Sequence, residues 1–137
     1  MTTQIELTDK DFLEQIENCT LDPVLFTHEN LLRMTWILIK KYGIKIALLK
    51  NNELKQNYYK NVFKNDKFNA TLTKAYTEIL YHFMQQTSTN NFEKLLREFP
   101  RLKYDFKDLV KTHYGYNILK EHRVETPEQN RPFLFTF

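Results

Sequence analysis

Apolar residues recur at helical spacing along most of the chain, and alternation of polar and apolar residues never persists beyond four positions. The first helical stretch, residues 8–19, opens on the capping sequence Thr8-Asp9-Lys10-Asp11 and is predicted to end before Pro23. The second follows Thr27 and is apolar on nearly every side, which is typical of a central, buried helix. Gly43 is expected to end this helix in a left-handed conformation.

The same spacing predicts further helices, each with a recognisable start or stop. They are a long amphipathic helix over residues 44–64, a helix capped by Asn69 that ends before the polar run 85–91, a helix over 92–99 stopped by Pro100, and a helix from Asp105 that Gly115 closes. Beyond Asn117 the chain is predicted to be a tail, which we expect to fold back because its terminal aromatic rings would favour aggregation if exposed. We therefore predict an all-α fold, a single-domain bundle of about five to six helices over residues 1–137 with an extended aromatic tail over 117–137.

Composition is that of an ordinary globular protein, with 42% hydrophobic and 27% charged residues among 137. The first residues lack the basic and apolar regions of a signal peptide, and no apolar run approaches the roughly 18 residues of a membrane span. Cys19 is the only cysteine, so neither an internal disulfide nor a cysteine-based zinc site is expected. We predict a soluble, cytoplasmic protein with no membrane contact and no cofactor.

The net charge of +3 conceals a local excess of lysine between Lys45 and Lys67. On a helix, Lys60, Lys64 and Lys67 lie along one side with aromatic residues between them, a pattern that suits a nucleic-acid backbone. The stretch contains no arginine, which is the better partner for phosphate, and lysines on a surface helix usually serve solubility. Nucleic-acid binding is therefore an unfavoured alternative, and the salt dependence of any binding would identify it.

Motifs that carry common enzyme chemistry are missing, because the chain has no glycine-rich phosphate loop, no Gly-x-Ser-x-Gly and no His-Glu-x-x-His. His28 stands out at the start of the buried second helix, where the helix dipole disfavours a protonated ring. A neutral imidazole there can bind a metal, accept a proton or cap the helix. Glu78 and His82 share a helix face as a half-site for a metal or, more commonly, a surface hydrogen-bonded pair, and His113 is expected near a helix C-terminus.

The motif around His28 belongs to a pattern of three segments. They are Phe26-Thr27-His28-x-x-Leu31-Leu32-Arg33-Met34-Thr35-Trp36, Lys67-Phe68-Asn69-x-Thr71-x-Thr73 and Thr112-His113-Tyr114-Gly115-Tyr116. Together they resemble a widespread family of small all-helical bacterial proteins of uncharacterised activity, whose pattern reads Phe-x-His-x-x-His-Leu-Arg-x-Ala-Trp and Tyr-His-x-Thr-x-Thr, with an arginine that corresponds to Arg131. The resemblance implies a polar cluster where the starts of the second and fourth helices converge.

Two decisive positions depart from that family pattern. Leu31 stands in place of the second histidine, and Asn69 stands in place of the histidine before Thr-x-Thr. One imidazole with amide and hydroxyl oxygens is a poor site for a transition metal, so we predict no bound metal. The polar residues that remain either form a ligand pocket or only cap helices and hold the tail; they are His28, Arg33, Asn69, Thr71, Thr73, Tyr114 and Arg131.

Three functions compete for this sequence. The first is a non-catalytic binding module for a small polar or anionic ligand or for a protein partner, which the missing metal ligands favour. The second is an enzyme of unknown reaction with His28 as acid or base, although the nearest carboxylate, Glu29, points about 100° away around the helix. The third is nucleic-acid binding through residues 45–67.

Overall fold

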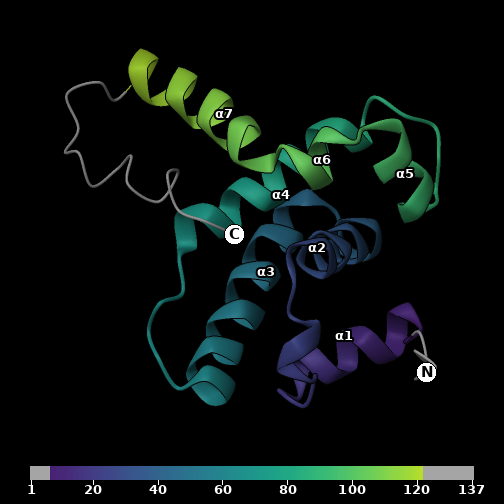
Figure 1. Ribbon diagram of the computed structural model, residues 1–137, viewed down its shortest axis with the longest axis vertical. Coiled ribbons are helices and arrows are strands. Elements are labelled where there is room, and N and C mark those ends of the chain that lie inside the picture. The colour runs from purple at the N-terminus through teal and green to yellow at the C-terminus, as the bar shows by residue number, and fades with distance from the viewer. Residues whose placement is uncertain (1–6, 122–137) are drawn as a thin grey trace.

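The computed structural model describes the backbone of residues 7–121 and the side chains of residues 7–113. Within that part of the chain seven α-helices and two short helical turns follow one another, and no β-strand occurs (Figure 1). The elements are α1 (Asp9–Glu17), η1 (Pro23–Leu25), α2 (His28–Tyr42), α3 (Ile44–Tyr58), η2 (Tyr59–Phe63), α4 (Ala70–Met84), α5 (Phe92–Glu98), α6 (Arg101–Tyr104) and α7 (Phe106–Glu121). The predicted all-α bundle is confirmed, whereas the aromatic end of the predicted tail, with Phe133, Phe135 and Phe137, lies outside the described residues.

Side-chain caps set the starts of four helices. In each, a side-chain oxygen accepts the backbone N–H three residues further on, which satisfies one of the free donors of the first turn. The caps are Thr8 to Asp11, Thr27 to Asn30, Asn69 to Leu72 and Asn91 to Lys94. Gly43 separates α2 from α3 with a φ of +85°, a conformation that residues with a Cβ rarely adopt. The predicted caps Thr8, Thr27 and Asn69 and the stop at Gly43 are therefore confirmed, whereas the cap at Asn91 was not predicted.

The predicted end of the last helix at Gly115 and the predicted start of the tail at residue 117 are both wrong. Gly115 does not close a helix, because α7 runs through it to Glu121, so residues 117–121 are helical rather than part of a tail. A single glycine costs only about 1 kcal/mol inside a helix, and the packing of its buried first turns outweighs that cost. Pro100 stops α5 as predicted but also begins the one-turn helix α6, since proline is well tolerated at a helix start.

Helix α2 lies at the centre of the bundle, as its pattern predicts. It packs against both α3 and α4, which also pack against each other, while α1 crosses α2 and α3 and α7 covers α4 (Figure 1). Leu32 and Leu38 of α2, Ala47 of α3 and Leu80 of α4 are fully excluded from solvent in this core. None of the helices within residues 7–121 combines the length and the apolar character needed to cross a bilayer.

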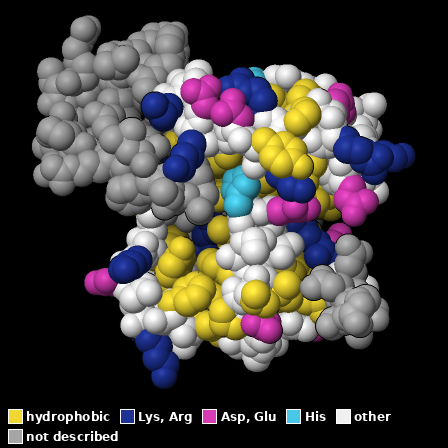
Figure 2. Space-filling view, viewed as in Figure 1, with side chains coloured by type: hydrophobic (Ala, Val, Ile, Leu, Met, Phe, Trp, Pro, Cys, Tyr) yellow, Lys and Arg dark blue, Asp and Glu magenta, His cyan; other side chains and the backbone are white. Residues whose placement is uncertain are grey.

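The lysine-rich segment is not one continuous basic face. Its α-helix ends at Tyr58, and the π-helical turn η2 follows. Tyr58 is buried, stacks on Phe26 with ring centres 4.3 Å apart, and donates a hydrogen bond from its hydroxyl to the Leu21 carbonyl oxygen at 2.6 Å. On the face shown in Figure 2, lysine and arginine side chains are interspersed with acidic and hydrophobic ones. The ring of Tyr58, which was expected among surface lysines, therefore belongs to the core.

Candidate functional site

A pocket of about 140 Å³ lies where the start of α2, the end of α3 and the start of α4 meet. Along α4 its wall follows a single helix face, because positions i, i+3, i+4 and i+7 point the same way. The lining residues are Phe26, His28, Leu31, Lys55, Tyr59, Asn69, Leu72, Thr73 and Tyr76. The structure thus brings together three of the predicted site residues, His28, Asn69 and Thr73.

His28 uses both ring nitrogens in hydrogen bonds that join three helices. Its Nε2 lies 2.9 Å from the Leu102 carbonyl oxygen in α6, and its Nδ1 lies 2.6 Å from the Tyr76 hydroxyl in α4. A carbonyl oxygen only accepts, so Nε2 carries the hydrogen, and in a neutral ring Nδ1 accepts from Tyr76. Burial lowers the pKa of His28, which favours this neutral form. His28 is therefore a tie between helices, with no nitrogen lone pair left over for a metal.

We expect nitrogen-15 NMR at pH 7 to show His28 as the neutral tautomer protonated on Nε2. Because its folded pKa is lowered, the unfolded chain takes up the proton first, so stability falls as the pH drops below about 6.5. Replacing His28→Ala should cost about 1–3 kcal/mol at pH 7, since it leaves buried partners without their hydrogen bonds. A doubly protonated ring at pH 7, or an unchanged denaturation midpoint in the variant, would contradict this assignment.

Lys55 is the most unusual group in the pocket. Its side chain is only 3% exposed, and its Nζ lies 4.1 Å from the centre of the Tyr76 ring. Within the described part of the chain it makes no hydrogen bond and no ion pair. Burial lowers the pKa of Lys55 to about 7, because desolvation disfavours the ammonium form. The titratable side chains that share the pocket are His28, Tyr59 and Tyr76, none of which supplies a negative charge at neutral pH.

A layer of buried polar side chains lies one helical turn away from the pocket. The side-chain amide of Asn51 donates to the hydroxyls of Thr35 and Thr77 at 2.9 and 3.0 Å. Those hydroxyls donate in turn to the carbonyl oxygens of Leu31 and Thr73, which line the pocket. The Oδ1 of Asn51 is fully buried and has no hydrogen-bond partner among the side chains of residues 7–113. Helices α2, α3 and α4 are thus fixed relative to one another directly beside the pocket.

Two further polar groups in the pocket wall are available to a ligand. Asn69 uses its Oδ1 to cap the Leu72 N–H, which leaves its side-chain NH₂ without a hydrogen bond to any described residue. The hydroxyl of Tyr59, in the π-helical turn η2, is likewise unbonded within the described residues, and burial raises the pKa of Tyr59 so that it stays protonated. The pocket therefore offers an amine, an amide N–H and a phenol as donors.

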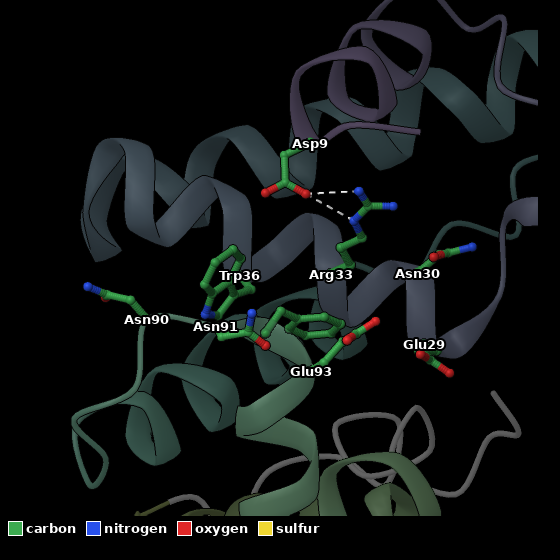
Figure 3. Close-up of a pocket in the computed structure, with 9 residues that line it drawn as sticks. Asp9, Glu29, Asn30, Arg33, Trp36, Asn90, Asn91 and Glu93 are labelled. Carbon is green, nitrogen blue, oxygen red and sulfur yellow. Dashed lines mark hydrogen bonds and ion pairs between the residues drawn. The ribbon is translucent and has the colours of Figure 1, made fainter. Parts of the chain in front are cut away.

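Arg33 lies in a different place, which corrects its assignment to the His28 site. Its guanidinium donates from Nε and Nη2 to Asp9 Oδ1 at 3.1 and 2.9 Å, and from Nη2 to the Leu7 carbonyl oxygen at 2.6 Å. Figure 3 shows the two bonds to Asp9 at a separate cavity of about 320 Å³, whose wall also includes Trp36 and Glu93. The carboxylate on the neighbouring helix α1 holds Arg33 there.

The other predicted site residues divide into two groups. Thr71 is half-buried but does not line the pocket, because two residues along α4 from Asn69 turn its side chain about 200° around the helix. The side chain of Tyr114 and all of Arg131 lie outside the described residues. The predicted polar cluster at the helix starts is therefore smaller than the sequence suggested.

The remaining histidines pair differently from the prediction. Glu78 contacts His113 across the bundle, with Oε1 and Nε2 3.1 Å apart, while His82 lies 2.7 Å from the side-chain nitrogen of Gln86. His113 is an interior residue of α7 rather than a C-terminal cap, because α7 continues to Glu121. In the part of the chain that the structure describes, no three His, Cys, Asp or Glu side chains gather closely enough to hold a metal.

Comparison with protein-family models, with curated proteins and with solved structures finds no match for this chain. The family resemblance of the segments that begin at Phe26, Lys67 and Thr112 therefore stays a prediction. Functional inference rests on the geometry and chemistry of the pocket.

The sequence-based predictions did not include Lys55, Tyr59 or Tyr76 as site residues. A signal for Lys55 was present, because Ala47, Asn51, Lys55 and Tyr58 recur at intervals of four, four and three and so share the buried face of α3. No comparable signal marked Tyr59, since its position depends on the π-helical turn that ends the helix.

Proposed function

We propose that this protein is a non-catalytic binding module that takes a small anionic ligand into the pocket of Lys55. The observation that carries the proposal is the buried amine of Lys55, which has no counter-charge among the described residues. A buried ammonium without a partner is strongly disfavoured, and the carboxylate or similar group of a ligand would supply the missing charge. A pocket of about 140 Å³ accommodates a ligand of roughly benzene size.

The neighbouring groups support the same proposal. The free NH₂ of Asn69 and the hydroxyl of Tyr59 are donors, which suits an anion, and the Tyr76 ring supports the positive charge of Lys55. An enzyme with His28 as acid or base is less well supported, because each ring nitrogen already has a hydrogen-bond partner. A cytoplasmic, bacterial setting is part of the proposal and is compatible with the free thiol of Cys19.

Propionate is expected to raise the thermal midpoint of the full chain at pH 6.5, where Lys55 is largely protonated. The shift should shrink at pH 9, because the neutral amine no longer attracts an anion and binding must then also take up a proton. Differential scanning fluorimetry with propionate, and with chloride at equal ionic strength, measures the effect. Lys55→Met should abolish the shift, whereas Lys45→Met, at an exposed position of the same helix, should retain it. Equal shifts in the two variants would contradict the proposal.

A further inference from the structure

The amine of Lys55 differs chemically from a lysine on the surface. With its pKa lowered to about 7, roughly half of the molecules carry the free amine at neutral pH, compared with about one in three thousand for an unperturbed lysine. The free amine has a lone pair and is a nucleophile, and desolvation in an apolar pocket is a recognised way to activate it.

The surroundings of Lys55 leave this nitrogen available for reaction. Within residues 7–113 no carboxylate pairs with it and no hydrogen bond holds it, and it lies 4.1 Å from the centre of the Tyr76 ring. The same side chain lines the pocket of about 140 Å³. A small molecule in the pocket is therefore in contact with the Lys55 side chain.

We propose that Lys55 captures a small aldehyde or 2-oxo acid in this pocket as a reversible imine on Nζ. This inference rests on the proposed function, because the compound must first enter the same pocket, and it names the class of compound that binds. A 2-oxo acid has a carboxylate, which the donor groups of Asn69 and Tyr59 favour, and a carbonyl carbon, which the amine attacks. The size of the pocket limits the compound to a few carbon atoms.

The step needs no oxidant, reductant or metal. The Nζ lone pair forms a bond to the carbonyl carbon while the π electrons of the C=O bond move to oxygen, and one proton passes from the nitrogen to that oxygen. The resulting carbinolamine loses its hydroxyl group, together with the second proton of the nitrogen, as water, and the C=N bond forms. Protonation of the imine nitrogen gives an iminium ion, which retains a positive charge beside the Tyr76 ring. We assign positioning roles to the Asn69 amide and the Tyr59 hydroxyl, which can hold the carboxylate of the bound compound.

Reductive trapping tests the inference on the full chain. The protein is incubated at pH 7 with pyruvate and cyanoborohydride, and intact mass and peptide mapping locate the secondary amine that results. We expect one adduct per chain on Lys55, formed at least about tenfold faster than on Lys45 of the same helix, because of the difference in free amine. In urea the preference should disappear. Absence of an adduct, or adducts spread equally over the lysines of the folded protein, would overturn the inference.

Propionate, which has the shape of pyruvate without the keto group, separates this inference from the proposed function. Stabilisation by propionate with no adduct from pyruvate would refute the imine and leave anion binding standing, whereas the lack of both would refute both. Lys55→Gln should lose the adduct and Lys45→Gln should keep it. Because the adduct is mapped in the wild-type chain, the test does not depend on whether Lys55→Gln folds.

Discussion

Between pH 7 and about 9.5 the free energy of unfolding is expected to rise by about 3 kcal/mol, because of one buried side chain. Burial lowers the pKa of Lys55 from 10.5 to about 7, so in this range the unfolded chain holds a proton that the folded protein has released. Stability therefore increases with pH, by about 1.4 kcal/mol for each unit in which only the unfolded state is protonated. Most proteins have their greatest stability at lower pH, which makes the predicted trend distinctive.

The trend should reverse above about pH 10. Burial raises the pKa of Tyr58, Tyr59 and Tyr76, so the unfolded chain loses those protons first and becomes favoured as the pH rises further. The predicted optimum therefore lies between the titration of Lys55 and that of the tyrosines. Among the side chains that share the pocket, His28 is already neutral at pH 7 and does not add to the slope.

Urea denaturation at several pH values between 7 and 9.5 measures the effect, with Lys55→Met as the control. Methionine keeps much of the shape of the lysine stem without the charge, so the variant should be more stable than the wild type at pH 7 and nearly independent of pH in this range. Surface lysines are present in both proteins and cancel in the comparison. Parallel pH profiles for the two proteins would show that Lys55 is solvated rather than buried.

The helix starts were predictable from the sequence because each depends on interactions between residues close together in the chain. Thr8, Thr27 and Asn69 cap helices through backbone groups only three residues away, and Gly43 ends α2 through its own φ. Such signals do not depend on the rest of the fold. The central position of α2 was also predictable, since a helix that is apolar on nearly every side has to be surrounded by other elements.

Residues whose place depends on distant partners were not predictable in the same way. His28 bonds to Tyr76, 48 residues away, and to Leu102, 74 residues away, and no local pattern indicates those distances. Arg33 forms an ion pair with Asp9 because α1 packs against α2, and the spacing of residues within α1 does not reveal that contact. The helix past Gly115 illustrates the same limit, since packing outweighed a local stop signal.

Lys55 was misjudged for a different reason. Lysine is almost never fully buried, so a lysine-rich stretch is reasonably interpreted as solvated. Here the helical spacing predicted burial of position 55, whereas the residue type predicted exposure, and the position is buried. Lys55 and Asn51 both lie on the face of α3 that carries Ala47 and Tyr58. Local rules are most often broken at functional or strained sites, and this conflict is one reason to look for function at Lys55.

Replacing Tyr76→Ala is expected to cost about 3–5 kcal/mol, the largest loss among the substitutions considered. The Tyr76 ring is buried, stacks on Phe106 with ring centres 4.7 Å apart, and lies beneath the Lys55 amine. Its hydroxyl bonds to His28, so the substitution leaves a cavity and also removes a buried polar contact. Urea denaturation at pH 7 measures the loss, and Tyr104→Ala, at a ring that is 77% exposed, should change stability by no more than about 0.5 kcal/mol.

Tyr76→Phe separates the hydroxyl from the ring. It should cost about 1–2 kcal/mol, because the cavity is avoided while Nδ1 of His28 loses its donor. Combined with His28→Ala in a double-mutant cycle, it should show a coupling energy of about 1 kcal/mol, since removal of either partner already breaks the same bond. Strictly additive losses would show that this bond does not hold α2 to α4. The pocket wall would then depend on packing of the Tyr76 ring alone.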